Sequence, residues 1–141
     1  MSAPGGQGLY VEEAGPANAP TIVFLHGGGW VSGSGGNYLP LAAEISAAAR
    51  CAVLLPDYRL APEHPFPAGL EDCIAAHDWL VGNGPSGRGP AKATFIAGDS
   101  AGGNLTLATL LALRDRKRPL PLGGIALSAA TDFTLASESL K

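Results

Sequence analysis

Charged residues are scarce in this sequence, and long hydrophobic runs are lacking. Only 15% of the 141 residues are charged, with 9 Lys and Arg against 12 Asp and Glu and a net charge of −3. A nucleic-acid-binding surface needs basic residues spread along one face. Here they cluster after a helical stretch, at Arg114, Arg116, Lys117 and Arg118, where they suit the negative end of the helix dipole. No apolar run approaches the ~18 residues of a membrane span, so we expect neither a nucleic-acid partner nor a membrane span.

Cysteine is also rare, and its two positions fit no metal site. Cys51 and Cys73 lack the spacing of metal ligands, so we expect buried, reduced thiols and no bound metal. The opening residues, MSAPGGQGLY, lack the positively charged segment and apolar stretch of a secretory signal. These absences predict a cytoplasmic protein whose cysteines are not bridged.

Glycine and proline are abundant, and they fall in clusters between short apolar runs. The 20 glycines and 12 prolines are typical of many tight connections between short elements. Continuous apolar runs predict buried strands, and the helically spaced stretches between them predict helices. The expected strands are Thr21–Leu25, Cys51–Leu55, Ala93–Ala97 and Gly124–Ser128, and the expected helices are Leu39–Arg50, Pro67–Val81 and Ala101 to about Arg116. This alternation predicts an α/β fold of about four mainly parallel strands with helices on both faces.

The chain divides into a short lead and one domain. Residues 1–20 precede the first expected strand, residues 21–141 make the domain, and a loop is expected at 82–90. In a parallel sheet, functional sites form at the carboxyl ends of the strands. The glycine-bounded polar clusters at 26–30 and 99–100 both follow expected strands, so we expect them at the same edge of the sheet.

One of these clusters, GDSAGGNL, predicts a nucleophilic serine. Gly98, Ser100 and Gly102 fit the GxSxG pattern, in which a sharp turn from strand to helix lifts the serine hydroxyl clear of the sheet. The expected strand before it and helix after it supply that setting, and the helix start would point backbone N–H groups at developing negative charge. Asp99 would line the site beside Ser100. The alternative is a helix start that is merely rich in glycine.

The other cluster, HGGGW, predicts an oxyanion hole. Residues without Cβ let backbone N–H groups approach a substrate closely, and preorganised donors of this kind stabilise the charge that forms in acyl transfer. We expect His26 to hold this loop rather than act as a base, and Gly27 and Trp30 to line the site. A phosphate cradle or a flexible turn is the alternative for this glycine run alone.

A third block, DYRLAPEHPFPA, predicts a fixed irregular loop. Its three prolines leave no room for a regular element. Its polar side chains are expected to hold the loop in place through hydrogen bonds rather than to act in chemistry. They are Asp57, Arg59, Glu63 and His64.

In this order and spacing, the three blocks resemble the hormone-sensitive-lipase family of α/β-hydrolase carboxylesterases. The resemblance covers about residues 20–138. It implies a partial α/β-hydrolase fold, hydrolysis of a small carboxylic ester and no cofactor. It also implies that Ser100 is the nucleophile and that the N–H groups of Ala101, Gly28 and Gly29 form the oxyanion hole. Family members usually carry a longer N-terminal segment, so the lead of this chain would build little or no cap over the site.

The sequence does not contain the family's triad acid and histidine. In the family's chain order both follow the serine. The histidines here are His26, His64 and His77, all before Ser100, and the acids after it are Asp115, Asp132 and Glu138. His77 falls on the apolar stripe of an expected helix and is expected in the core. Asp132 follows the last expected strand, where the family has a structural or site-lining loop.

These gaps lead to two expectations about function and one about association. We expect an incomplete hydrolase domain, the N-terminal part of a serine esterase, with little activity alone. The alternative is a non-catalytic small-molecule-binding module derived from an esterase. Since no later strand covers the last expected one, its apolar edge is expected to promote self-association.

Overall fold

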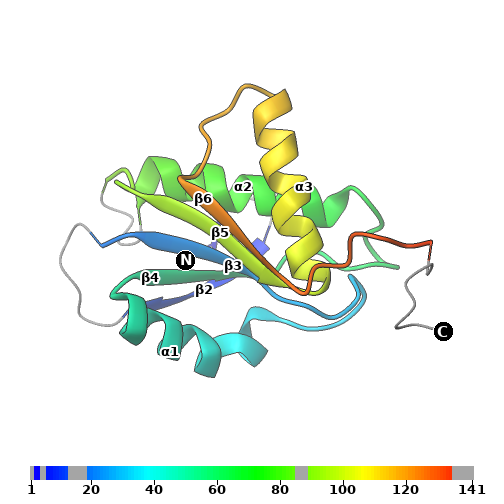
Figure 1. The fold of residues 1–141 in the computed structure, drawn as a ribbon, viewed down its shortest axis with the longest axis horizontal. Helices are drawn as coiled ribbons and strands as arrows, with labels where there is room; N and C mark the ends of the chain where they lie inside the picture. The colour runs from blue at the N-terminus through cyan, green and yellow to red at the C-terminus, as the bar shows by residue number, and fades with distance from the viewer. Residues whose placement is uncertain (1, 4–5, 13–18, 85–88, 135–141) are drawn as a thin grey trace.

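The computed structural model describes residues 2–3, 6–12, 19–84 and 89–134. They form a six-stranded sheet in the order β1-β2-β4-β3-β5-β6 (Figure 1). The strands are β1 (Ser2–Ala3), β2 (Gly6–Glu12), β3 (Thr21–Leu25), β4 (Ala52–Pro56), β5 (Thr94–Asp99) and β6 (Gly123–Leu127). The helices are a 3₁₀ turn η1 (Gly35–Tyr38), α1 (Leu39–Ala49), α2 (Ala68–Asn83) and α3 (Ala101–Asp115).

The predicted parallel sheet is confirmed. β4, β3, β5 and β6 run parallel, with Leu25 opposite Gly98 and Gly98 opposite Ala126. β3 has the predicted bounds, whereas β4, β5 and β6 differ from the expected strands by one or two residues. Every residue of β4 is buried, as expected of a strand with neighbours on both sides and helices on both faces.

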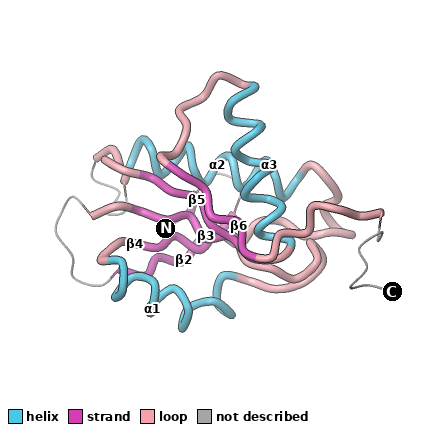
Figure 2. Tube along the Cα trace, in the orientation of Figure 1, coloured by secondary structure: helices cyan, strands magenta, loops and turns pink. Residues whose placement is uncertain are grey.

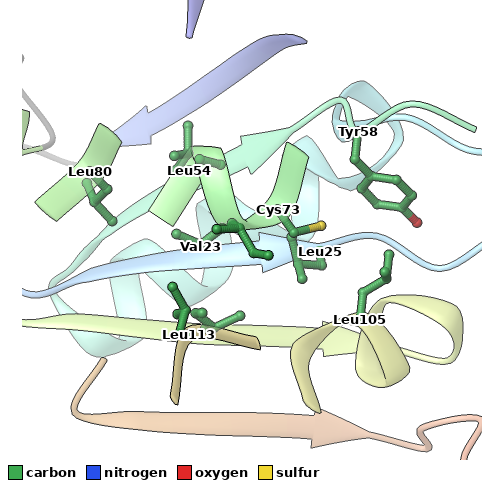
Figure 3. Packing of buried hydrophobic residues seen from close by; sticks show 11 residues of the cluster. Val23, Leu25, Leu54, Tyr58, Cys73, Leu80, Leu105 and Leu113 are labelled. Carbon is green, nitrogen blue, oxygen red and sulfur yellow. The ribbon is translucent and has the colours of Figure 1, made fainter. Parts of the chain in front are cut away.

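Helices cover both faces of the sheet, and the core has two parts. α1 lies on one face, and α2 and α3 lie on the other (Figures 1 and 2). The core under α2 and α3 contains Val23, Leu25, Cys73, Leu105 and Leu113, all 5% exposed or less (Figure 3). A smaller core lies under α1 and includes Phe24, Ala42, Val53 and Ala97.

Residues 1–20, predicted as a lead, contain two strands, β1 and β2, that were not predicted. β2 pairs antiparallel with β4, with Leu9 opposite Leu55, and β1 pairs antiparallel with β2. A short glycine-containing segment carries little strand signal of its own, and here the free edge of β4 supplies the partner that orders it. The loop expected at 82–90 begins two residues later, because α2 continues to Asn83; residues 85–88 of the prediction lie outside the described residues.

The loop after β4 is irregular, as predicted, but only part of the prediction about its polar side chains is confirmed. Asp57 accepts a hydrogen bond from the Gly35 N–H at 2.6 Å. Asp72, 6% exposed, accepts hydrogen bonds from the backbone N–H and the guanidinium of Arg59 at 2.8 to 2.9 Å. For Glu63 and His64 the prediction was wrong: both are exposed, and neither side chain is hydrogen-bonded to another described residue.

The basic cluster after α3 serves a structural purpose. Arg116 forms an ion pair with Glu71, and Arg118 pairs with Asp78, so both tie the end of α3 to α2. None of the described helices is long and apolar enough to cross a membrane.

Candidate active site

Ser100 sits in a sharp turn between β5 and α3. Its φ of 52° and ψ of −117° are not helical, and it occupies the N-cap position of α3. A residue other than glycine with positive φ stores strain of about 1–3 kcal/mol, which the surrounding structure must hold in place. Its backbone is held by hydrogen bonds, because the Ser100 N–H donates to the Leu127 carbonyl at 2.9 Å and the Asn104 N–H donates to the Ser100 carbonyl at 3.0 Å. The side chain is exposed, so the turn presents the hydroxyl to solvent.

Two glycines allow this turn to pack against the end of β3. A Cβ at Gly102 would overlap the carbonyl oxygen of Leu25, and one at Gly98 would overlap the Gly102 carbonyl. Any side chain at either position would therefore push α3 away from the sheet. The strand, turn and helix predicted around Ser100 are all present.

The HGGGW loop leaves the end of β3, next to this turn. Gly28 and Gly29 have φ of 123° and 64°, and Trp30 has φ of 64°. The Gly28 carbonyl is held by the N–H groups of Val31 and Ser32 at 3.2 and 3.1 Å. The N–H groups of Gly28 and Gly29 donate to no other described residue, so both donors remain free.

A hydrogen-bond network joins the two loops. The Gly27 N–H donates to Asp99 Oδ1 at 3.1 Å and lies 3.0 Å from the Tyr38 hydroxyl. The Tyr38 hydroxyl in turn donates to Asp99 Oδ2 at 2.9 Å. Burial raises the pKa of Tyr38, so the phenol stays protonated and able to donate at neutral pH. Asp99 was predicted in the site, whereas Tyr38 was not, because a lone tyrosine carries no sequence pattern that points to a site.

His26 is buried at the start of the HGGGW loop and fixes the position of the loop. It is 1% exposed, and its ring stacks on Tyr58 with 4.2 Å between the centroids. Its Nδ1 lies 2.7 Å from the Gly27 carbonyl, and the Tyr58 hydroxyl donates to the His26 carbonyl at 2.6 Å. These contacts agree with the loop-holding role expected of His26.

A pocket of about 310 Å³ opens beside the HGGGW loop. Its walls are mostly apolar and come from this loop, the loop after β4, α2 and α3. The lining includes Gly29, Trp30, His64, Phe66, Leu70 and Leu105. Trp30 also contacts Phe133, with 5.7 Å between the ring centroids. The pocket can take an apolar group beside Gly29.

The structure leaves Ser100 without a base among the described residues. His77 is fully buried in α2 with Nε2 3.2 Å from Thr94 Oγ1, as expected of a core histidine. Asp132 is exposed, and hydrogen bonds from Thr134 lower its pKa. No histidine or acid side chain is hydrogen-bonded to the Ser100 hydroxyl within the described part of the chain, and Glu138 lies outside it. The same part has no cluster of three or more His, Cys, Asp or Glu side chains that could hold a metal ion.

Comparison with known proteins identifies the family. The sequence model of a protein family with the α/β-hydrolase fold matches residues 22–141. The chain belongs to this family. An acetyl-hydrolase of Streptomyces hygroscopicus is 41% identical over 120 residues, which cover 84% of this chain and 38% of that protein. The carboxylic ester hydrolase LipN of Mycobacterium tuberculosis is 37% identical over 150 residues, covering 99% of this chain and 40% of LipN.

Solved esterase structures share the same arrangement. An esterase of the bacterial hormone-sensitive lipase family superposes with a TM-score of 0.87 at 40% identity, covering 99% of this chain and 46% of that one. EstE5, studied after a soak with p-nitrophenyl butyrate, gives a TM-score of 0.86 at 42% identity over the same shares. The resemblance to this esterase family is confirmed, and so is the partial α/β-hydrolase fold. The chain spans less than half the length of these relatives and matches their N-terminal part.

Proposed function

We propose that this chain carries the nucleophile and the oxyanion donors of a carboxylic ester hydrolase. The observation that carries the proposal is the strained turn at Ser100, which Gly98 and Gly102 allow to pack against the strand leading into the HGGGW loop. Esters are the proposed substrates because the relatives of this fold are named as ester hydrolases.

In the proposed reaction, the Ser100 hydroxyl attacks the carbonyl carbon of the ester. The carbonyl oxygen gains negative charge, which the N–H groups of Gly28, Gly29 and Ala101 stabilise. Collapse of this intermediate breaks the ester C–O bond, and the alcohol leaves with the proton that the Ser100 hydroxyl gave up, while the acyl group stays on Ser100. Water then attacks the acyl group, which releases the acid and returns a proton to the Ser100 oxygen. An apolar part of the substrate occupies the pocket beside Gly29 and Trp30.

We further propose that this chain has little activity alone. A serine hydroxyl is a weak nucleophile near neutral pH unless a base takes its proton. Loss of the histidine base in a serine hydrolase lowers turnover by about 10⁶. His26 and His77 are both buried in contacts of their own. His64 is exposed in the loop after β4 and is not hydrogen-bonded to Ser100, so none of the three histidines is paired with the serine.

The test is hydrolysis of p-nitrophenyl butyrate with imidazole added as an external base. The expected result is almost no turnover without imidazole and a rate that rises with imidazole above that of a Ser100→Ala control at the same concentrations. Equal rates for the two proteins at every imidazole concentration would contradict the assignment of Ser100. Fast turnover without imidazole, lost in Ser100→Ala, would contradict the expectation of low activity.

A second candidate function is small-molecule binding without catalysis. The observation that favours it is the open apolar pocket of about 310 Å³ beside the HGGGW loop. Binding a ligand in this pocket requires no catalytic base. Isothermal titration with butyrate esters and their non-hydrolysable ether analogues tests this function. This function is favoured if the wild-type chain and Ser100→Ala bind the esters and the ether analogues equally tightly and imidazole produces no hydrolysis by the wild-type chain.

A further inference from the structure

Aromatic rings gather around the pocket beside the HGGGW loop. Phe, Trp and Tyr make up only 6% of the sequence, yet Trp30, Tyr58 and Phe66 all line this pocket. His64 adds a fourth ring, and apart from Arg59 the rest of the lining is aliphatic or glycine. The pocket therefore offers ring surfaces to a ligand, as well as an aliphatic wall.

Two of these rings are not used in packing against other rings of the protein. Phe66 lines the pocket and is nevertheless 84% exposed. Neither Phe66 nor His64 makes a ring contact with another of the described side chains, whereas Trp30 packs against Phe133. Aromatic pairs in stacked or edge-to-face geometry gain binding energy beyond that of the area they bury. A ligand with an aromatic ring can make such pairs here.

The pocket offers a ligand no unpaired permanent charge. Arg59 is the arginine in its lining, and its Nε and Nη2 both donate to the buried carboxylate of Asp72 at 2.8 Å. No acidic side chain lines the pocket in the described part of the chain. A charged group placed here would lose hydration without gaining a counter-ion, so the pocket favours a neutral ligand group.

The walls that carry the rings are held in place by the fold. The Ala61 N–H donates to the Trp30 carbonyl at 2.9 Å, which joins the loop after β4 to the HGGGW loop. A Cβ at Gly69 would lie 2.9 Å from the Arg59 carbonyl oxygen, so glycine lets α2 lie close against the same loop. Binding to fixed walls costs little ordering of the protein, and a planar ring has no internal torsions to order.

The size of the pocket also suits a ring. A cavity of about 150 Å³ is enough to bind benzene, and this pocket of about 310 Å³ has room for one ring and the short group that joins it to an ester. We propose that the pocket binds a neutral aromatic ring of the substrate, with Phe66 and Trp30 as the residues that determine this specificity. The proposal rests on the proposed function, because it takes the pocket to be part of the ester site.

The test compares two neutral ethers that cannot be hydrolysed, butyl phenyl ether and butyl cyclohexyl ether. Ligand-observed NMR titration with the wild-type chain gives a Kd for each. The cyclohexyl ring is the more hydrophobic of the two, so burial of apolar surface alone would favour the cyclohexyl ether. The expected result is the opposite order, with the phenyl ether bound about 2- to 10-fold more tightly because of the aromatic pairs. Equal binding, or tighter binding of the cyclohexyl ether, would overturn the proposal.

Two exposed wall positions separate ring contacts from the burial of apolar surface. Phe66→Leu keeps an apolar side chain but removes the ring, and it is expected to lower the preference for the phenyl ether by about twofold or more. The control is Val31→Ala, at a position that is 60% exposed and also lines the pocket. It is expected to weaken the binding of both ethers alike and so to leave the preference unchanged. Circular dichroism checks that both variants keep the wild-type secondary structure. A preference that survives Phe66→Leu in full, or that Val31→Ala abolishes, would overturn the assignment.

A competition experiment tests whether the ring occupies the ester site. The phenyl ether is expected to inhibit the imidazole-supported hydrolysis of p-nitrophenyl butyrate, and Phe66→Leu is expected to raise the concentration needed. A preference for the phenyl ether without inhibition would overturn the placement of the ring in the ester site. The same preference in a chain that shows no imidazole-supported hydrolysis would support the ring-binding pocket and overturn the proposed function instead.

Discussion

Tyr38, the last residue of η1, donates a hydrogen bond to Asp99, the last residue of β5. The hydroxyl lies 2.9 Å from Asp99 Oδ2, and it also lies 3.0 Å from the Gly27 N–H. Asp99 precedes Ser100 and Gly27 precedes Gly28, so the contact sets the proposed nucleophile and the proposed oxyanion donors relative to each other. A mechanism that depends on donors placed within a few tenths of an ångström needs this kind of support.

Removal of the Tyr38 hydroxyl is expected to destabilise the fold. Tyr38→Phe keeps the ring contact with Phe24 but deletes a partner of the Asp99 carboxylate, and we expect a loss of about 1–2 kcal/mol in the free energy of unfolding. Chemical denaturation measures it. Ser34→Ala removes an exposed hydrogen bond to Asn37 and is the matched control, with an expected change below about 0.5 kcal/mol. Equal effects of the two substitutions would contradict the network.

Two glycine substitutions test the tight turn at Ser100. Gly102→Ala is expected to lower stability by about 2 kcal/mol or more, since its Cβ would overlap the Leu25 carbonyl. Gly82→Ala, in α2 with open space around it, is expected to raise stability by about 0.5–1 kcal/mol because alanine favours the helix. Thermal melting of both variants measures the difference. A Gly102→Ala protein as stable as wild type would show that the turn does not press on β3.

The buried His77 makes the fold sensitive to acid. Burial lowers its pKa in the folded chain below the ordinary value of 6.5, so the unfolded chain takes up a proton first as the pH falls. The stability that neutral His77 gives is therefore present above pH 6.5 and is lost below it, by up to about 1.4 kcal/mol for each pH unit. Urea denaturation from pH 7.5 to 5 measures this slope.

Matched histidine variants isolate the contribution of His77. His77→Gln is expected to flatten the slope, whereas His64→Gln, at an exposed position, is expected to leave it unchanged. A wild-type slope in His77→Gln would assign the acid sensitivity to another group.

Both cysteines are expected to be unreactive in the folded chain. Cys51 and Cys73 are 4% and 1% exposed and unbridged, and burial raises the pKa of both thiols, so little thiolate forms at neutral pH. Titration with a thiol reagent is expected to detect neither thiol under native conditions and both in concentrated guanidinium chloride. Fast native reaction of Cys73 would show that α2 opens readily from the sheet.

The sequence was most informative where one local pattern decides the structure. The apolar run at Thr21–Leu25 predicted β3 with its observed bounds. The glycines at 98 and 102 predicted the turn at Ser100, because a Cβ at either position would overlap a backbone carbonyl. β2 was not predicted, because its strand character comes from pairing with β4 rather than from its own residues. Tyr38 was missed for the same reason: only the fold brings it to Asp99, 61 positions later in the chain.

Covalent labelling of Ser100 tests the central claim most directly. Incubation with a fluorophosphonate in imidazole buffer, followed by mass spectrometry of the intact chain and its peptides, reports both the number and the position of adducts. The account predicts one adduct on the peptide that contains Ser100 and none on the Ser100→Ala chain. An unlabelled wild-type chain, or one labelled equally in Ser100→Ala, would contradict the assignment of Ser100 as the nucleophile.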